Sequence, residues 1–333
     1  MLKRTVYGIT LTLLLTGMLT LVFHTQPAKT EPKMVSPGYE LGIWGARSGY
    51  TIPDEASWVI ASLPDYEKPR QNISVILCWY SLHPPFNPYN PFETESEINE
   101  VEEALRSVPL ENFWGMLFIN EEHYRSHIGF YDDVNTTWFG ERLLGYPLYL
   151  EENPSATTDE WKDEMFLRMI RGFYNYFHVK GIKVGITANS GSTVPNYRNQ
   201  SWIKGIPAAF GEPAMAFIRQ HYDFVFLYTY SRNLEDFYWT KQYFSIIDNL
   251  WQKQKKFWIL TQIWPDNEAV WEKETIALEI KNCLDRNIVV TSYHNTNPPF
   301  EETWPLIKRA IELYNSEAPY FEEYVYGKNL LTG

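Results

Sequence analysis

Residues 113–121, FWGMLFINE, have the pattern of a strand that is buried on both faces. Parallel strands covered by helices on both sides are nearly continuous in apolar residues, and this run stays apolar until Asn120. Glu121, Glu122 and His123 follow directly, so ionisable side chains come at the carboxyl end. The segment therefore predicts a buried parallel strand that opens onto a polar site.

Six further segments have the same apolar pattern, and longer amphipathic stretches separate them. These predicted strands are residues 40–46, 73–82, 183–189, 224–231, 257–264 and 287–294. The predicted helices are residues 53–63, 94–108, 157–181 with Thr158 as N-cap and Gly181 as stop, 211–222, 233–254, 268–286 and 300–315.

The alternation of strands and helices predicts a parallel sheet with helices outside it. The chain has 333 residues, which fits a closed (β/α)8 barrel of about 250 residues with insertions. An eighth strand is expected within 125–157 or 196–210, or the ring is an irregular (β/α)7 barrel. An open doubly wound sheet is the alternative, but no G-x-G-x-x-G fingerprint follows the first strand.

The N-terminal segment is predicted to be a signal peptide or a membrane anchor. Lys3 and Arg4 precede an uncharged apolar stretch at 6–23, which is the pattern of an export signal. We expect this segment at 1–24, a linker at 25–37, the barrel at 38–318 and a tail at 319–333. The body would then be extracytoplasmic, secreted or tethered, and the sequons at Asn72, Asn135 and Asn199 would permit glycosylation.

Composition limits the partners of the chain. The formal net charge is −12, with 41 acidic and 29 basic residues, which argues against nucleic acid as a partner. The 13 Trp, 23 Tyr and 19 Phe suit a large core or a cleft that stacks on sugar rings. No cofactor and no metal are predicted, and Cys78 and Cys283 are too far apart in the predicted ring to form a disulfide.

In a barrel of this kind, functional residues gather at the carboxyl ends of the strands. Those ends carry acids, amides, Tyr and Trp. The catalytic candidates are Glu121, Glu122, Asp266 and Glu268. The substrate-binding candidates are Trp44, Arg47, Trp79, Tyr80, Asn120, His123, Asn189, Tyr228, Tyr230, Gln262, Trp264, Tyr293 and His294.

Only one of the two adjacent glutamates can point into the mouth, because side chains alternate along a strand. Inward Leu117 and Ile119 would select Glu121, which we favour, whereas inward Phe118 and Asn120 would select Glu122. Both could instead cap the following turn or pair with Arg125.

The acids after other strands have competing roles. Asp266 or Glu268 could supply the partner carboxylate, although both also suit the first turn of the next helix. Asp223 begins a strand and is expected at the opposite end of the barrel.

The rim of acids, amides and aromatic residues resembles that of glycoside hydrolases built on (β/α)8 barrels. In one large clan of these enzymes the general acid is a Glu that follows an Asn at a strand end, and Asn120–Glu121 is similar. The resemblance covers the architecture of residues 38–316 and implies cleavage of glycosidic bonds by paired carboxylates between Trp and Tyr platforms. The chain departs from that clan at 291–295, TSYHN, because no acid ends the seventh predicted strand.

Two other functions remain open. A non-catalytic carbohydrate-binding barrel would explain the aromatic rim and the missing second acid together. A metal-dependent hydrolase would use His123 and His127, with Asp132, Asp133, His83 or His294 nearby. The long segment 125–157 is expected to form a cleft wall in either case.

Overall fold

The computed structural model describes residues 38–44, 52–62, 73–79, 95–107, 112–119, 134–189, 211–228, 251–260, 273–293 and 300–316. All of them belong to the compact unit Ser36–Gly333. The other unit, Met1–Val35, contains the predicted export segment and lies outside the described residues. None of the described helices is both long and apolar enough to cross a membrane. The borders of linker, barrel and tail stay predictions.

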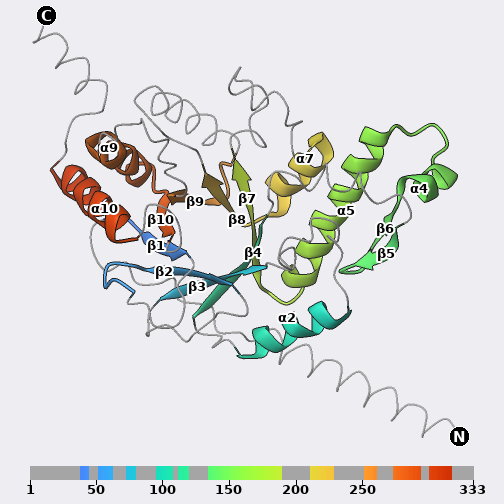
Figure 1. Ribbon diagram of the computed structural model, residues 1–333, viewed down its shortest axis with the longest axis horizontal. Coiled ribbons are helices and arrows are strands. Elements are labelled where there is room, and N and C mark those ends of the chain that lie inside the picture. Colours follow the sequence, from blue (N-terminus) through green and yellow to red (C-terminus); the bar gives the residue numbers. More distant parts are fainter. Residues whose placement is uncertain are drawn as a thin grey trace, which may run out of the picture. The chain divides into compact units, whose positions relative to one another are not determined.

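Eight parallel strands close into a barrel, so the TIM-type (β/α)8 fold is confirmed (Figure 1). Around the ring they follow the order β1-β10-β9-β8-β7-β4-β3-β2. Their bounds are Leu41–Trp44 (β1), Trp58–Ser62 (β2), Ser74–Trp79 (β3), Phe113–Phe118 (β4), Lys183–Asn189 (β7), Phe224–Tyr228 (β8), Lys255–Leu260 (β9) and Val289–Tyr293 (β10).

The stagger of the strands is that of a TIM barrel. The stagger is counted by passing from each residue to its paired residue on the next strand, once around the ring. To return to the starting residue, the path must move two residues along β7, two along β9, one along β10 and three along β1. The total of eight for eight strands is the TIM-barrel shear, which rules out the irregular seven-stranded ring.

The eighth strand is β2, which the sequence had predicted as the helix at 53–63. That helix prediction is wrong: Pro53 and Asp54 belong to a turn, and Trp58–Ser62 pairs with β1 on one side and β3 on the other. Trp58 and Ile60 face the barrel interior, whereas Val59 and Ala61 face the helices. This alternation buries both faces of β2, which a helix in the same place could not do between two strands.

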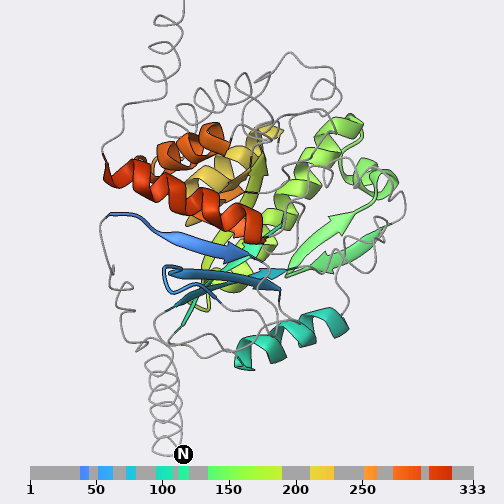
Figure 2. The same ribbon diagram turned by 60° about the vertical axis from the view of Figure 1, so that its left-hand side comes forward.

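The described helices surround the barrel (Figures 1 and 2). They are α2 (Glu95–Ser107), α4 (Tyr146–Glu152), α5 (Thr158–His178), α7 (Gly211–His221), α9 (Lys273–Leu284) and α10 (Phe300–Asn315). The N-cap of α5 is Thr157, one residue before the predicted Thr158, because Thr157 and Glu160 form a reciprocal capping box. The predicted helix at 233–254 lies almost entirely outside the described residues.

The segment 125–157 does not supply a barrel strand. Its described part forms the antiparallel hairpin β5 (Asn135–Trp138) and β6 (Glu141–Leu144), followed by α4. Trp138 of the hairpin packs between Phe118 of β4 and Phe173 of α5, with ring centroids 5.9 and 6.2 Å away. The hairpin is therefore an outer layer beside α5, and 196–210, the other predicted location, lies outside the described residues.

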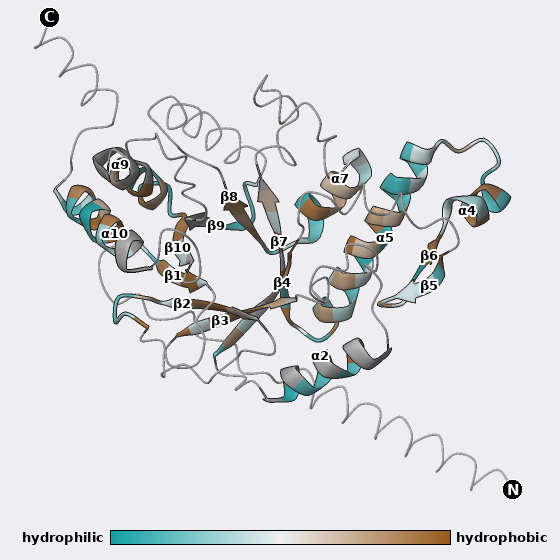
Figure 3. Cartoon of the chain, in the orientation of Figure 1, coloured by the Kyte–Doolittle hydropathy of each residue, from teal (hydrophilic) through white to brown (hydrophobic). Residues whose placement is uncertain are grey.

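The barrel strands are coloured largely as hydrophobic in Figure 3. Their buried residues belong to two clusters. Residues such as Val59, Leu77 and Phe118 pack outward against the helices. Residues such as Trp58, Leu117 and Phe226 fill the interior. Glycine makes this filling possible, since a Cβ on Gly185 would lie 2.1 Å from the ring of Phe224.

Candidate functional site

All eight strands are parallel, so their carboxyl ends meet at one opening, here called the mouth. The opposite opening is called the base. Alternation along each strand assigns its positions to the inner or the outer face, except at the register shift near the start of β4. The inner positions show how the chemistry changes between the two openings.

The base is closed by aromatic rings. Trp58 packs edge-to-face on Trp114 and Phe257, with ring centroids 4.9 and 5.1 Å away. Phe224 contacts Trp114 in turn, at 4.9 Å. This layer closes the interior of the barrel at its base with apolar rings.

Charged groups cover the rings of the base. Lys255 Nζ lies 5.1 Å from the ring of Trp58 and 2.5 Å from Glu40 Oε2. Trp58 Nε1 donates to Glu40 Oε1 at 3.1 Å, and Lys183 Nζ lies 4.4 Å from the ring of Trp114. Lys183 and Lys255 therefore act as cation–π caps of the core.

Farther along the strands, polar residues join apolar ones on the inner face. Thr187 and Thr291 are buried inner residues, 2% and 0% exposed, and Cys78 lies one strand position below the end of β3. Burial raises the pKa of the Cys78 thiol well above its ordinary value, so the thiol stays protonated and is a poor nucleophile. Cys78 and Cys283 form no disulfide, as predicted.

Trp44 and Ile119 form the described floor of the mouth. Trp44 ends β1 with 4% exposure and packs edge-to-face on Phe226 at 5.2 Å. Ile119, directly after β4, is 8% exposed and belongs to the interior cluster. Trp44 is thus mostly covered in the described structure, and its predicted contact with substrate stays a prediction.

The eight described barrel strands contain no Asp or Glu. Any carboxylate chemistry at the mouth must therefore come from residues that follow the strands. Asp223, just before β8, accepts a hydrogen bond from Val184 N at 2.8 Å. It lies at the base end, as predicted, and ties β7 to β8.

The register of β4 bears on the choice between the two glutamates. Leu117 and Ile119 belong to the interior cluster, whereas Phe118 packs outward on Phe173 at 5.1 Å. Continued alternation by two residues predicts an inner position for Glu121 and an outer one for Glu122. Both glutamates lie outside the described residues, so this orientation is a prediction from the strand below them.

Four substrate-binding candidates can be placed by backbone position. Trp79 is the last residue of β3, Asn189 of β7, Tyr228 of β8 and Tyr293 of β10, so their backbones lie at the mouth end of the barrel. The roles of all four stay predictions.

The remaining candidates lie outside the described residues: Arg47, Tyr80, Asn120, Glu121, Glu122, His123, Tyr230, Gln262, Trp264, Asp266, Glu268 and His294. Within the described ranges, no three His, Cys, Asp or Glu side chains come together as metal ligands. The proposed metal ligands among the histidines and aspartates are also outside these ranges.

Comparison with known proteins gives structural but no sequence relatives. No family model and no curated protein matches the chain. A chitinase from Chromobacterium violaceum is similar over 82% of this chain and 99% of its own, with 8% identity and a TM-score of 0.43. An endo-β-1,3-glucanase from Amycolatopsis mediterranei, in complex with laminaritriose, is similar over 81% and 92%, with 10% identity and a TM-score of 0.40.

A β-1,3-glucanosyltransferase from Rhizomucor miehei is similar over 76% of this chain and 86% of its own, with 8% identity and a TM-score of 0.37. Sequence identity this low concerns the fold alone. The strand order and stagger of the described barrel identify that fold independently of these proteins.

Sequence reasoning missed two buried inner residues, Thr187 and Thr291. Thr187 and Thr291 lie within strands instead of after them, so a search restricted to strand ends passes over them. The alternating pattern alone could have found both threonines.

Proposed function

We propose that the chain is a glycoside hydrolase whose active site is the mouth of the barrel. The inner face of the barrel carries this proposal: Trp and Phe rings close the base, whereas Cys78, Thr187 and Thr291 are inner polar residues farther along the strands. A sugar presents hydroxyl groups and flat apolar faces, which suits hydroxyl and amide side chains above an aromatic floor.

Glu121 is the general acid in this proposal. It follows the inner residues Leu117 and Ile119 and stands at the end of a strand that contains no other ionisable side chain. Glu121 gives its proton to the glycosidic oxygen as the bond from that oxygen to the anomeric carbon breaks, and water completes the hydrolysis. Asn189 and Tyr228 supply hydrogen bonds to sugar hydroxyls from the neighbouring strands.

The partner carboxylate is assigned to Asp266 or Glu268, which follow β9. In the ring, β7 and β8 separate β4 from β9, so the ends of β4 and β9 lie on well-separated sides of the mouth. That placement suits two carboxylates acting on either side of one glycosidic bond. The export segment at 1–24 would deliver this activity outside the cytoplasm.

The absence of Asp and Glu from the described barrel strands favours a second candidate, a barrel that binds carbohydrate without cleaving it. Binding needs only the stacking and hydrogen-bonding residues of the mouth. The two candidates predict the same ligand class and differ only in turnover.

The test is release of reducing ends from a polysaccharide panel by the purified full-length chain. The panel includes β-1,3-glucan and chitin, the polysaccharides named in the similar structures. We expect turnover on at least one polysaccharide, a loss of about 10²–10⁴-fold in Glu121→Gln, and near-normal turnover in Glu122→Gln. The loss in Glu121→Gln should shrink on aryl glycosides, whose leaving groups need little protonation.

Three outcomes would count against parts of the proposal. Binding to a polysaccharide without turnover would support the non-catalytic barrel. Loss of activity in Glu122→Gln alone would show that alternation does not continue beyond Ile119. Normal activity in both variants would remove the two glutamates from the mechanism.

A further inference from the structure

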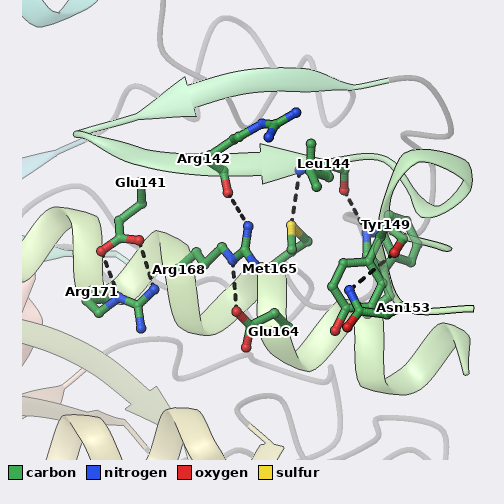
Figure 4. A network of polar contacts seen from close by, with 10 residues as sticks. Glu141, Arg142, Leu144, Tyr149, Asn153, Glu164, Met165, Arg168 and Arg171 are labelled. Atoms are coloured by element: carbon green, nitrogen blue, oxygen red, sulfur yellow. Dashed lines mark hydrogen bonds and ion pairs between the residues drawn. The ribbon is translucent and has the colours of Figure 1, made fainter. Parts of the chain in front are cut away.

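Among the described residues, the hairpin β5–β6 has one covered edge and one edge without partners, here called the open edge. The backbone groups of β6 that point away from β5 bond to side chains of α5 (Figure 4). Arg168 Nη1 donates to Arg142 O at 2.9 Å, and Trp161 Nε1 donates to Leu144 O at 2.7 Å. Leu144 N donates to Met165 Sδ at 3.1 Å. The outer edge of β6 is thereby closed.

The register fixes which groups of β5 face outward. Arg142 and Leu144 use their backbone groups on α5, and they pair with Thr137 and Asn135 of β5. In an antiparallel ladder, the residues of such a pair point their N–H and C=O groups away from each other's strand. Asn135 and Thr137 therefore direct their backbone groups to the open edge, where no described group pairs with them.

The open edge coincides with the sequon Asn135-Thr136-Thr137. The side chains of Asn135 and Thr137 are both exposed, whereas Thr136 and Trp138 lie on the opposite face, with Trp138 fully buried. The Oδ1 atom of Asn135 accepts a long hydrogen bond from Arg142 Nε at 3.4 Å. Among the described residues, the amide nitrogen Nδ2 donates to no group.

We propose that Asn135 is an N-glycosylation site and that its glycan shields the open edge of β5. A bond forms between Nδ2 of Asn135 and the anomeric carbon of an oligosaccharide activated as a diphosphate ester. The bond from that carbon to the phosphate oxygen breaks, the diphosphate leaves with the electron pair, and Nδ2 loses one proton to a base. The donor is supplied by the export pathway, and the proposal does not depend on the hydrolase function.

The site fits the requirements of both chemistry and fold. A glycan is bulky and solvated, so its Asn must remain exposed after folding, as Asn135 does. An uncovered strand edge is prone to pair with other chains, and proteins protect such edges with charge, covering groups or short strands. A glycan on the first residue of a four-residue strand adds a covering group to an edge that is already short.

The experiment uses the full chain expressed through the export pathway of an N-glycosylating host. Three variants are compared: Thr137→Ser, which keeps the sequon, and Thr137→Ala and Asn135→Gln, which remove it. The sequons at Asn72 and Asn199 stay intact in all of them. We expect the wild type and Thr137→Ser to carry a glycan on the peptide containing Asn135, and the other two variants to lose the mass of one glycan.

Light scattering on the same samples tests the shielding role. Thr137→Ala and Asn135→Gln should self-associate at several-fold lower concentration than Thr137→Ser. An unmodified Asn135 in the wild-type chain would overturn the site. Equal self-association of Thr137→Ala and Thr137→Ser, with glycan present only on the latter, would overturn the shielding role.

Discussion

At its base the barrel is closed by indole and phenyl rings under charged caps, whereas farther along the strands the inner face also includes the hydroxyl groups of Thr187 and Thr291 and the thiol of Cys78. Trp58, Trp114 and Phe257 gain their energy from burial and ring contacts. Thr291 buries a hydroxyl group where a well-packed apolar residue would stabilise the fold more. The difference teaches that the base serves stability, and it fits the proposal that the mouth serves binding.

The largest expected effect comes from removing the central ring of the base. Trp58→Ala should lower the free energy of unfolding by about 3–5 kcal/mol, because it leaves a cavity beneath Trp114 and Phe257 and removes a hydrogen bond to Glu40. Chemical denaturation measures the loss, and Trp58→Phe should give a smaller one. A loss below 1 kcal/mol for Trp58→Ala would show that the base is not where stability resides.

The second prediction concerns the glycine that admits Phe224. Gly185→Ala should cost about 3 kcal/mol, since its Cβ would lie 2.1 Å from the Phe224 ring in a packed interior. Gly181→Ala is the matched control, with φ of +72° but nothing within 4 Å of the added Cβ, and should cost about 1 kcal/mol. Thermal and urea unfolding compare the pair, and equal losses would argue against tight packing around Phe224.

A third, smaller effect concerns the charged cap. Glu40→Gln should lower the free energy of unfolding by about 1 kcal/mol, because the neutral amide loses the ion pair with the half-buried Lys255. The loss should shrink as salt screens the interaction in the wild type. Urea titrations at low and high salt measure it, and the exposed pair Arg309–Glu312 provides a control through Glu312→Gln. Equal losses of unfolding free energy in Glu40→Gln and Glu312→Gln would show that the ion pair at the base contributes no more than an exposed one.

The smallest expected effect concerns the hydroxyl group of Thr291 on the inner face of the barrel. Thr291 Oγ1 is buried and has no hydrogen-bond partner among the described residues. Thr291→Val should therefore raise the free energy of unfolding by up to about 1 kcal/mol. Denaturant midpoints measure the change. A clear loss of stability would show that the hydroxyl has a partner and that the polarity of the inner face is itself structural.

Much of the barrel follows from the sequence, because strands covered on both faces are continuous apolar runs. Segments such as Lys183–Asn189 and Phe224–Tyr228 stand out for this reason. The strand β2 was missed because Pro53 and Asp54 resemble a helix start and its five residues are too few to show a clear period.

The inner and outer faces are harder to predict, because one irregular pairing changes the phase. In β4 the register shifts between Phe113, which pairs with Val75, and Gly115, which pairs with Ile76. Trp114 joins the interior cluster, whereas Phe113 packs outward, so alternation counted from the start of β4 would assign its end incorrectly. The residues beyond the shift, Leu117 and Ile119, are what make Glu121 the stronger candidate.

The most direct test of the central claim is a crystal structure of the Glu121→Gln variant with an oligosaccharide of its best substrate. The account predicts a sugar chain across the mouth, with the scissile glycosidic oxygen about 3 Å from the side chain of residue 121. A sugar bound on another surface, or one whose glycosidic oxygen lies beyond the reach of residue 121, would contradict the account.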